Sequence, residues 1–82
     1  LNALNIFPNP GTDWFTVIID TACKSCLVDL YDSKGRNVYN NLTFVNPQKK
    51  IRLNLSNIDN GIYLLVLNNK GEIHTGRLII AR

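Results

Sequence analysis

The chain has 82 residues, of which 45% are hydrophobic and 18% are charged. This length fits a single domain, and the composition is that of a folded globular protein rather than a disordered tail. No apolar run approaches the roughly 18–20 residues that span a bilayer, and no signal-peptide pattern opens the chain. The formal net charge is +3, but the basic residues are scattered among acids, whereas nucleic-acid binding needs clustered charge. We therefore expect neither membrane insertion nor a nucleic-acid partner.

The sequence predicts strands and turns instead of helices. Asn occurs twelve times and Ala only three times, and Val, Ile, Thr, Tyr and Phe are frequent, a balance that favours strands. No window carries apolar residues at helical spacing over three turns. Short apolar segments recur about every ten residues between turn residues, which is typical of a sandwich or barrel. The predicted strands are residues 3–7, 14–20, 27–32, 36–44, 51–55, 62–67 and 72–81.

Alternation within these strands predicts which side chains enter the core. The second strand places Phe15, Val17 and Ile19 on one face, and the fifth alternates in the same way, so each has one wall in the core and one in water. The sixth is apolar on both faces, which predicts a central strand covered on both sides. Asp29 lies inside the third strand and is expected to point to solvent.

Glycine and proline mark the predicted turns. Pro8 and Pro10 end the first strand, because proline cannot donate to a ladder. Gly35 and Gly71 each close a hairpin, for which we predict a type I turn followed by a left-handed bulge. Gly61 is expected to take the positive φ of a tight turn. Seven short strands in two sheets predict an all-β fold, an immunoglobulin-like seven-stranded antiparallel β-sandwich.

Residues for catalysis or metal binding are few. His74 is the one histidine, and the sequence indicates no partners that would make it part of a metal site or a Ser–His pair. We expect it on the surface or at a strand edge. The carboxylates fall mostly at turns, and no glycine-rich phosphate-binding spacing is present. The sequence therefore predicts no enzyme, no metal site and no cofactor.

Cys23 and Cys26 form the one sharp local motif. A redox pair would need a helix N-terminus, which is not predicted here, and a zinc site would need ligands from a second molecule. We favour a disulfide across the turn between the second and third strands, with free thiols as the next alternative. Such a disulfide would add about 2 kcal/mol and would indicate an oxidising compartment.

Trp14 and Phe15 are neighbours in one strand, so they cannot both face the same core. One of them is expected to be exposed at the sheet edge. There it serves either as a contact residue or as a cover over the loops.

Four further stretches share a pattern. Residues 6–10 read IFPNP, residues 28–36 VDLYDSKGR, residues 53–63 LNLSNIDNGIY and residues 76–82 GRLIIAR. In this order they resemble the motifs of the type A C-terminal sorting domains of the type IX secretion system of Bacteroidota. The resemblance covers nearly the whole chain. Cys23 and Cys26 depart from it, since such tails do not ordinarily carry this pair.

The resemblance implies a non-catalytic secretion signal with an immunoglobulin-like fold. Residues 1–82 would be a single C-terminal sorting domain, a fragment of a larger exported protein. The cargo would pass through the periplasm, cross the outer membrane through the translocon and reach the cell surface or the medium. A processing protease would usually remove the tail, and a homodimer by strand exchange is a further assembly to consider.

The resemblance also assigns the sorting motifs to particular residues. These are Pro8, Asn9, Pro10, Tyr31, Asp32, Gly35, Arg36, Gly61, Tyr63, Arg77 and Arg82. We expect Pro8 and Pro10 to hold the opening segment off the sheet, so that the preceding chain is accessible to the protease. The hairpins and the last strand would present backbone edges and basic side chains to the translocon.

Two other functions compete with this one. The alternative is an immunoglobulin-like binding or adhesion module of a secreted or surface protein, with Trp14 as its contact residue for protein or carbohydrate. A redox or metal protein built on Cys23 and Cys26 is more distant.

Overall fold

The structure is a computed structural model that describes residues 2–19, 23–45 and 50–82, without the side chains of residues 2–3, 23–25 and 41–45. Its described residues form strands, turns and bends and no helix, so none of them forms a helix that could cross a membrane. The strands are β1 (Asn2–Ala3), β2 (Asn5–Phe7), β3 (Trp14–Ile18), β4 (Cys23–Tyr31), β5 (Asn37–Val45), β6 (Lys50–Asn54), β7 (Gly61–Asn69) and β8 (Glu72–Ile80).

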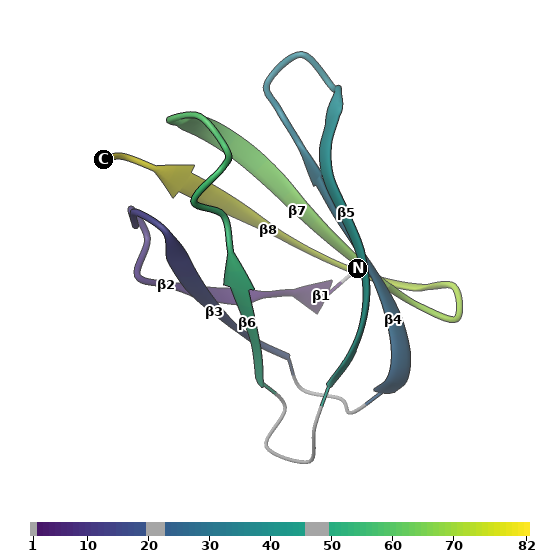
Figure 1. Cartoon of the computed structure of the whole chain (residues 1–82). Coiled ribbons are helices and arrows are strands. Elements are labelled where there is room, and N and C mark those ends of the chain that lie inside the picture. Colours follow the sequence, from purple (N-terminus) through teal and green to yellow (C-terminus); the bar gives the residue numbers. More distant parts are fainter. Residues whose placement is uncertain (1, 20–22, 46–49) are drawn as a thin grey trace.

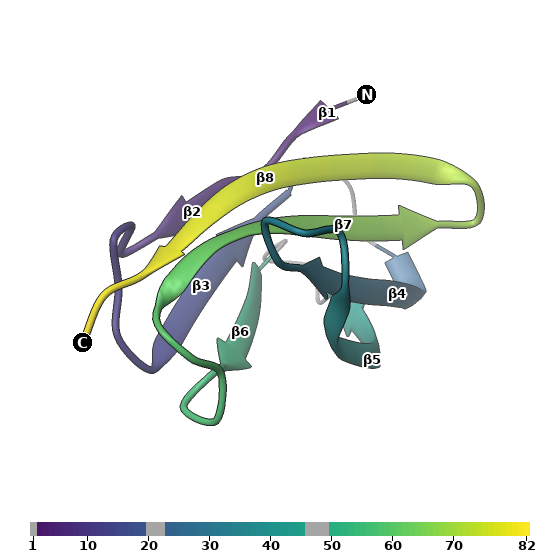
Figure 2. The ribbon, with the colours of Figure 1, turned by 90° about the horizontal axis from the view of Figure 1, so that it is seen from above.

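The strands form two sheets that pack against each other (Figures 1 and 2). One sheet has five strands in the order β1-β8-β7-β4-β5, and the other has three in the order β2-β3-β6. All neighbouring strands are antiparallel except β1 and β8, which run parallel. The all-β prediction is therefore confirmed.

The first predicted strand is divided between the two sheets. β1 pairs with β8, whereas β2 pairs with β3, so the described chain has eight strands instead of seven. Leu4 lies between them, and its backbone N–H donates to the Thr75 carbonyl over 2.8 Å. The chain crosses β8 at Gly76, where an added Cβ would lie only 2.8 Å from Ile6 Cδ1 and 3.1 Å from Leu4 Cβ. Glycine at position 76 is what allows this close crossing.

The core lies between the sheets and follows the predicted alternation. Phe15, Val17 and Ile19 are buried, and so are the inward residues of β6, while Arg52 and Asn54 are exposed. The five-stranded sheet contributes the opposite wall. Its buried hydrophobic side chains are Cys26, Val28, Leu30, Tyr63, Leu65, Leu67, Leu78 and Ile80.

The prediction that the sixth strand is covered on both faces is wrong. β7 is central in its sheet, with Tyr63, Leu65 and Leu67 buried. Ile62 and Leu64, on its other face, are 54% and 46% exposed. The described residues place no layer over this outer face, so apolar side chains there stay in contact with water.

The hairpin turns agree with the prediction at one glycine and differ at another. Gly35 has a φ of +82° and its N–H donates to the Asp32 carbonyl over 3.0 Å, as in a type I turn with a left-handed bulge. Lys70 and Gly71 have φ of +52° and +93°, and Asn69 pairs with Glu72. This is a two-residue turn of type I′, whose twist matches that of the flanking strands.

Gly61 does not take the positive φ that the sequence suggested. It is the first residue of β7 and pairs with Ile80. An added Cβ would lie 3.4 Å from the Tyr63 ring, an ordinary contact.

Replacing Gly76 by alanine should lower the free energy of unfolding by about 1–3 kcal/mol, because the new Cβ overpacks the crossing with Leu4 and Ile6. Gly61→Ala is the matched control, and its loss should stay below about 0.5 kcal/mol. Urea unfolding followed by tryptophan fluorescence measures both variants. Equal losses would show that β8 is not crossed as described.

Candidate functional site

Most of the predicted motif residues gather at one end of the sandwich (Figure 1). This end is formed by the β2–β3 connection, the tip of the β4–β5 hairpin, the β6–β7 connection and the C-terminus. We call it the motif end and define it as residues 8–13, 32–36, 55–60 and 81–82. The β7–β8 hairpin lies at the opposite end (Figure 1).

The opening motif is fastened to the edge of β8. Asn9 Nδ2 donates to the Arg77 carbonyl over 2.8 Å, and Asn9 Oδ1 accepts from the Ile79 N–H over 2.9 Å. The side-chain amide therefore makes the pair of hydrogen bonds that the backbone of a neighbouring strand would make. Gly11 continues the pairing, since its N–H donates to the Ile79 carbonyl and its carbonyl accepts from the Ala81 N–H. The expectation that Pro8 and Pro10 hold this segment off the sheet is wrong, because the residues between and after them bind it there.

Asp32 organises the β4–β5 turn. Its carboxylate accepts from the backbone N–H groups of Lys34 and Arg36, both over 2.9 Å, and from Arg36 Nε over 2.8 Å. The pKa of Asp32 is lowered below the 3.8 of an unperturbed aspartate, first by the Arg36 N–H and further by the Arg36 guanidinium. The side chain of Arg36 stays 73% exposed, which leaves it accessible to a partner.

Tyr63 anchors the β6–β7 connection. Its hydroxyl donates to the Asp59 carbonyl four residues upstream, over 2.5 Å. Burial raises the pKa of Tyr63, and the charges of Asp59 and Asp32 raise it further. Around it lies an open hollow of about 340 Å³, lined by residues from the β4–β5 turn, the start of β5 and the β6–β7 connection. The lining residues are Asp32, Arg36, Val38, Asn57, Ile58, Asp59 and Tyr63.

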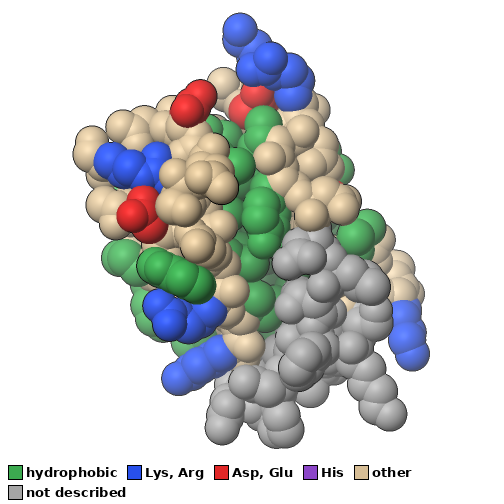
Figure 3. Space-filling view, viewed as in Figure 1, with side chains coloured by type: hydrophobic (Ala, Val, Ile, Leu, Met, Phe, Trp, Pro, Cys, Tyr) green, Lys and Arg blue, Asp and Glu red, His purple; other side chains and the backbone are tan. Residues whose placement is uncertain are grey.

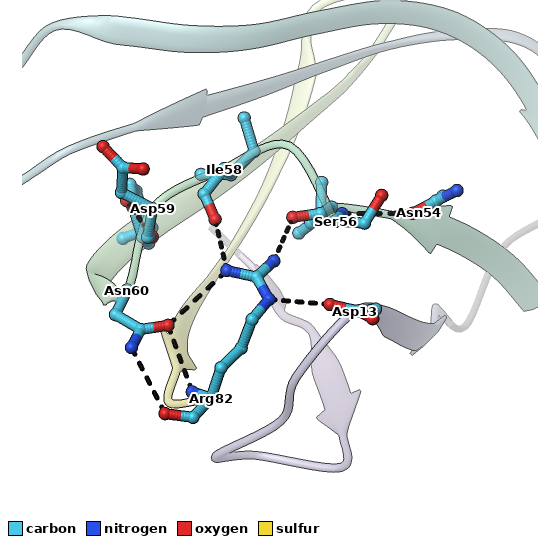
Figure 4. A network of polar contacts seen from close by, with 9 residues as sticks. Asp13, Asn54, Ser56, Ile58, Asp59, Asn60 and Arg82 are labelled. Atoms are coloured by element: carbon cyan, nitrogen blue, oxygen red, sulfur yellow. Dashed lines mark hydrogen bonds and ion pairs between the residues drawn. The ribbon is translucent and has the colours of Figure 1, made fainter.

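Arg82 joins the connections of the motif end (Figure 4). Its Nε donates to Asp13 Oδ1 over 2.7 Å, its Nη1 to the Ile58 carbonyl over 2.6 Å and its Nη2 to the Leu55 carbonyl over 2.7 Å. Asn60 holds the backbone of the same residue, because its Oδ1 accepts from the Arg82 N–H over 3.1 Å. One guanidinium thus ties β8 to both the β2–β3 and the β6–β7 connections.

The sequence had placed Arg82 in a motif but had not identified Asp13 and Asn60 as its partners. Asp13 stood among the turn carboxylates, and no spacing rule links it with a residue 69 positions away. Asn60 lies within the third motif stretch, residues 53–63, and this was the one sequence signal that pointed to it.

Two predicted motif residues face outward on the five-stranded sheet. Tyr31 and Arg77 both stand opposite Leu64, one from β4 and the other from β8. Tyr31 is half-buried and Arg77 is exposed. The backbone carbonyl of Arg77 is the acceptor for Asn9, so this residue links the sheet face to the motif end.

The cysteines do not lie in a turn. Both belong to β4, which pairs with β5 through Cys23↔Val45 and Cys26↔Thr43, with a shift of register between them. A bulge of this kind adds a residue to one strand and increases its local twist. Cys26 is buried and disulfide-bonded. The side chain of Cys23 lies outside the described residues, so the pairing of Cys23 with Cys26 stays a prediction.

Two polar residues are more buried than the sequence suggested. His74 is 1% exposed on the inner face of β8, and its Nε2 lies 2.8 Å from Glu72 Oε1. His74 lies four and six residues before Leu78 and Ile80, so it shares the buried face of β8 with them. This spacing was the signal that the sequence analysis missed. Asp29 is 9% exposed, because the side-chain amides of Asn37 and Asn40 cover its carboxylate and donate to it over 2.9 and 2.8 Å. The expectations of a surface histidine and a solvated Asp29 are both wrong.

The guanidinium, amide and carboxylate groups of the motif end hold its loops together. Among the residues that the structure describes, no three or more His, Cys, Asp or Glu side chains cluster to hold a metal ion. A family model described as a secretion system C-terminal sorting domain matches residues 5–81. The chain therefore belongs to this family, and it is a C-terminal secretion signal of the type IX secretion system. No curated protein matches the chain.

Arg82→Ala should lower the free energy of unfolding by about 1–3 kcal/mol, because three acceptors lose a charged donor. Arg82→Lys keeps the charge but should recover only part of the loss, since one ammonium cannot reach the three acceptors in the plane of a guanidinium. Urea unfolding of both variants measures this. A fully stable Arg82→Lys chain would show that only the charge matters.

Asp32 should contribute to the acid sensitivity of the fold. Its pKa is lower in the folded than in the unfolded chain, so the ionised form stabilises the folded state above about pH 4, and this contribution disappears as the pH falls through the folded pKa. Between about pH 5 and pH 2, the Asp32→Asn variant should therefore lose less stability than the parent chain. Urea midpoints across this range measure the difference, and parallel pH profiles would refute the assignment.

Proposed function

We propose that the sorting signal is the folded surface of the motif end, read by the outer-membrane translocon of the type IX secretion system. The observation that carries this proposal is the joining of segments far apart in the sequence. Asn9, Asn60 and Arg82 hold the C-terminal strand against two loops. An unfolded chain would present the same residues without this geometry, so recognition by the translocon would require the folded domain.

The exposed Arg36 side chain is available to a partner at the motif end. The Arg36 side chain is 73% exposed beside the hollow that Tyr63 and Asp59 line. Arg36 can therefore donate hydrogen bonds to a carboxylate or carbonyl of a partner without breaking the core. Its Asp32 partner holds the turn in place, so that the guanidinium stem is presented from a rigid base.

For the fold, we propose an immunoglobulin-like sandwich. Two features support this. In the five-stranded sheet, the order β8-β7-β4-β5 resembles that of a variable-type immunoglobulin sheet, in which the last two strands lie beside the third strand and its added neighbour. Tyr63 near the start of β7 bonds to a backbone carbonyl upstream, as in the tyrosine corner of that fold.

For the pathway, we propose that the domain does no chemistry itself and that its cargo passes through the periplasm before the outer membrane. The processing protease would cut in the chain that precedes the domain. The domain belongs to an export system that delivers proteins across the outer membrane to the surface or the medium. A homodimer by strand exchange stays a prediction, and the two-residue β1, held by only two register pairs, is the strand most easily exchanged.

Export of a periplasmic reporter fused ahead of this chain tests the proposal in a host with the type IX machinery. Arg36→Glu should lower the secreted fraction at least fivefold while circular dichroism shows that the purified domain stays folded, because the ion pair with Asp32 that it breaks is exposed and contributes little to stability. Lys70→Glu, in the β7–β8 hairpin at the opposite end, carries the same charge change on an exposed side chain and should be exported like the parent. Normal export of Arg36→Glu, or equal defects in the two variants, would contradict recognition at the motif end.

A further inference from the structure

The outer face of the three-stranded sheet lies outside the motif end and presents a different set of side chains. Its side chains follow from the strand register: Phe7 stands opposite Thr16, which stands opposite Arg52, and Trp14 stands opposite Asn54. Asn5, Ile18 and Lys50 complete the next row along the strands. We call this surface the β2-β3-β6 face.

Two large aromatic side chains are exposed on this face. Trp14 is 49% exposed and Phe7 is 45% exposed. Full burial of such large apolar side chains would lower the free energy of the folded state further. They belong to neighbouring strands and lie diagonally across the sheet, a spacing within reach of aromatic side chains. Two aromatic groups therefore stand next to each other on an open, sheet-like surface.

Arg52 packs over the Trp14 indole and brings hydrogen-bond donors to this face. Its guanidinium carbon lies 4.6 Å from the centroid of the Trp14 ring, which is within the range of a cation–π contact. This contact limits the rotation of both side chains. About half of Trp14 still faces solvent, so the ring and the guanidinium can meet one ligand together.

The charged residues of the three strands themselves are basic. Lys50 and Arg52 point outward, and no residue of β2, β3 or β6 is an acid. The neighbouring Asp13 is bound to Arg82 over 2.7 Å. Figure 3 shows hydrophobic and basic side chains side by side over this sheet. Such a face attracts an anionic ligand.

The polarity of the face distinguishes a carbohydrate from a protein partner. Beside the aromatic groups stand the short polar side chains Thr16 and Asn54, whereas the buried centre of a protein interface is more apolar than its rim. Exposed aliphatic side chains, Ile62 and Leu64, lie instead on the outer face of β7. A sugar ring has flat C–H faces and hydroxyl edges, which match exposed aromatic rings beside hydroxyl and amide groups.

We propose that the β2-β3-β6 face binds an acidic polysaccharide. Sugar rings stack on Trp14 and Phe7, and the Arg52 guanidinium donates to a carboxylate of the ligand. Thr16 and Asn54 bond to hydroxyl groups. This site lies on a different surface from the motif end and adds a carbohydrate-binding activity to the sorting signal.

Titration of the 82-residue chain with polygalacturonate tests the proposal, because Trp14 is the only tryptophan and its fluorescence reports on this face directly. Binding should perturb the Trp14 emission and weaken at higher salt. Arg52→Ala should raise the apparent Kd by about tenfold, the size expected for a hydrogen bond between charged groups. Lys34→Ala also removes one positive charge but lies in the turn between β4 and β5 of the other sheet, so its Kd should stay within about twofold.

Affinity electrophoresis in gels that contain polygalacturonate extends the test to Trp14→Ala, which carries no fluorescent reporter and should lose its retardation. Poly-L-glutamate carries similar charge without sugar rings, and dextran carries sugar rings without charge. Binding of polygalacturonate well above both supports the proposal. Equal binding of poly-L-glutamate would show a surface for acidic polymers in general, including acidic proteins, and would overturn the carbohydrate assignment. No binding of polygalacturonate, or equal losses in Arg52→Ala and Lys34→Ala, would overturn it as well.

Discussion

The Arg82 guanidinium joins the end of the C-terminal strand to two loops that come from distant parts of the chain. It donates to the Asp13 carboxylate and to the carbonyls of Leu55 and Ile58, while its own backbone is held by Asn60. An exposed ion pair alone contributes at most about 1 kcal/mol. Here the planar group distributes its donors over two loops, and this requires that both loops and the end of β8 be in position together. This interdependence supports the proposal that the sorting signal is a property of the folded domain.

The two sheets then leave three surfaces of different chemistry. The motif end is polar and built from loops. The outer face of β7 exposes Ile62 and Leu64, whereas the outer face of the other sheet exposes Trp14 and Phe7 among basic and amide side chains. Successive side chains of a strand point to opposite faces of the sheet. The residues that build the interior are therefore flanked by residues that form the outer surfaces. A domain of 82 residues can thus combine a sorting signal with other contacts.

Local patterns predicted the strands well, but their limits only roughly. The alternation of Phe15, Val17 and Ile19 correctly identified one wall of the core, and the turn at Gly35 followed from a glycine at the bulge position. The hairpin at Gly71 was harder, because the positive φ of Lys70 is unusual for that residue type and turns type I into type I′. The doubly apolar β7 was misread, since a hydrophobic residue on a strand does not reveal whether a second layer covers it.

The amino-acid sequence by itself determined the class of fold and the approximate positions of the strands along the chain, because alternation and turn chemistry act over a few neighbouring residues. The motif residues followed from the resemblance to the family. Only the tertiary structure decided that Leu4 carries the chain from one sheet to the other and that Asn9 replaces a backbone at the edge of β8. The burial of His74 and the partners of Arg82 were decided there as well. These outcomes depend on contacts between residues as far apart in the sequence as Leu4 and Thr75, which form only when both sheets have closed around the core.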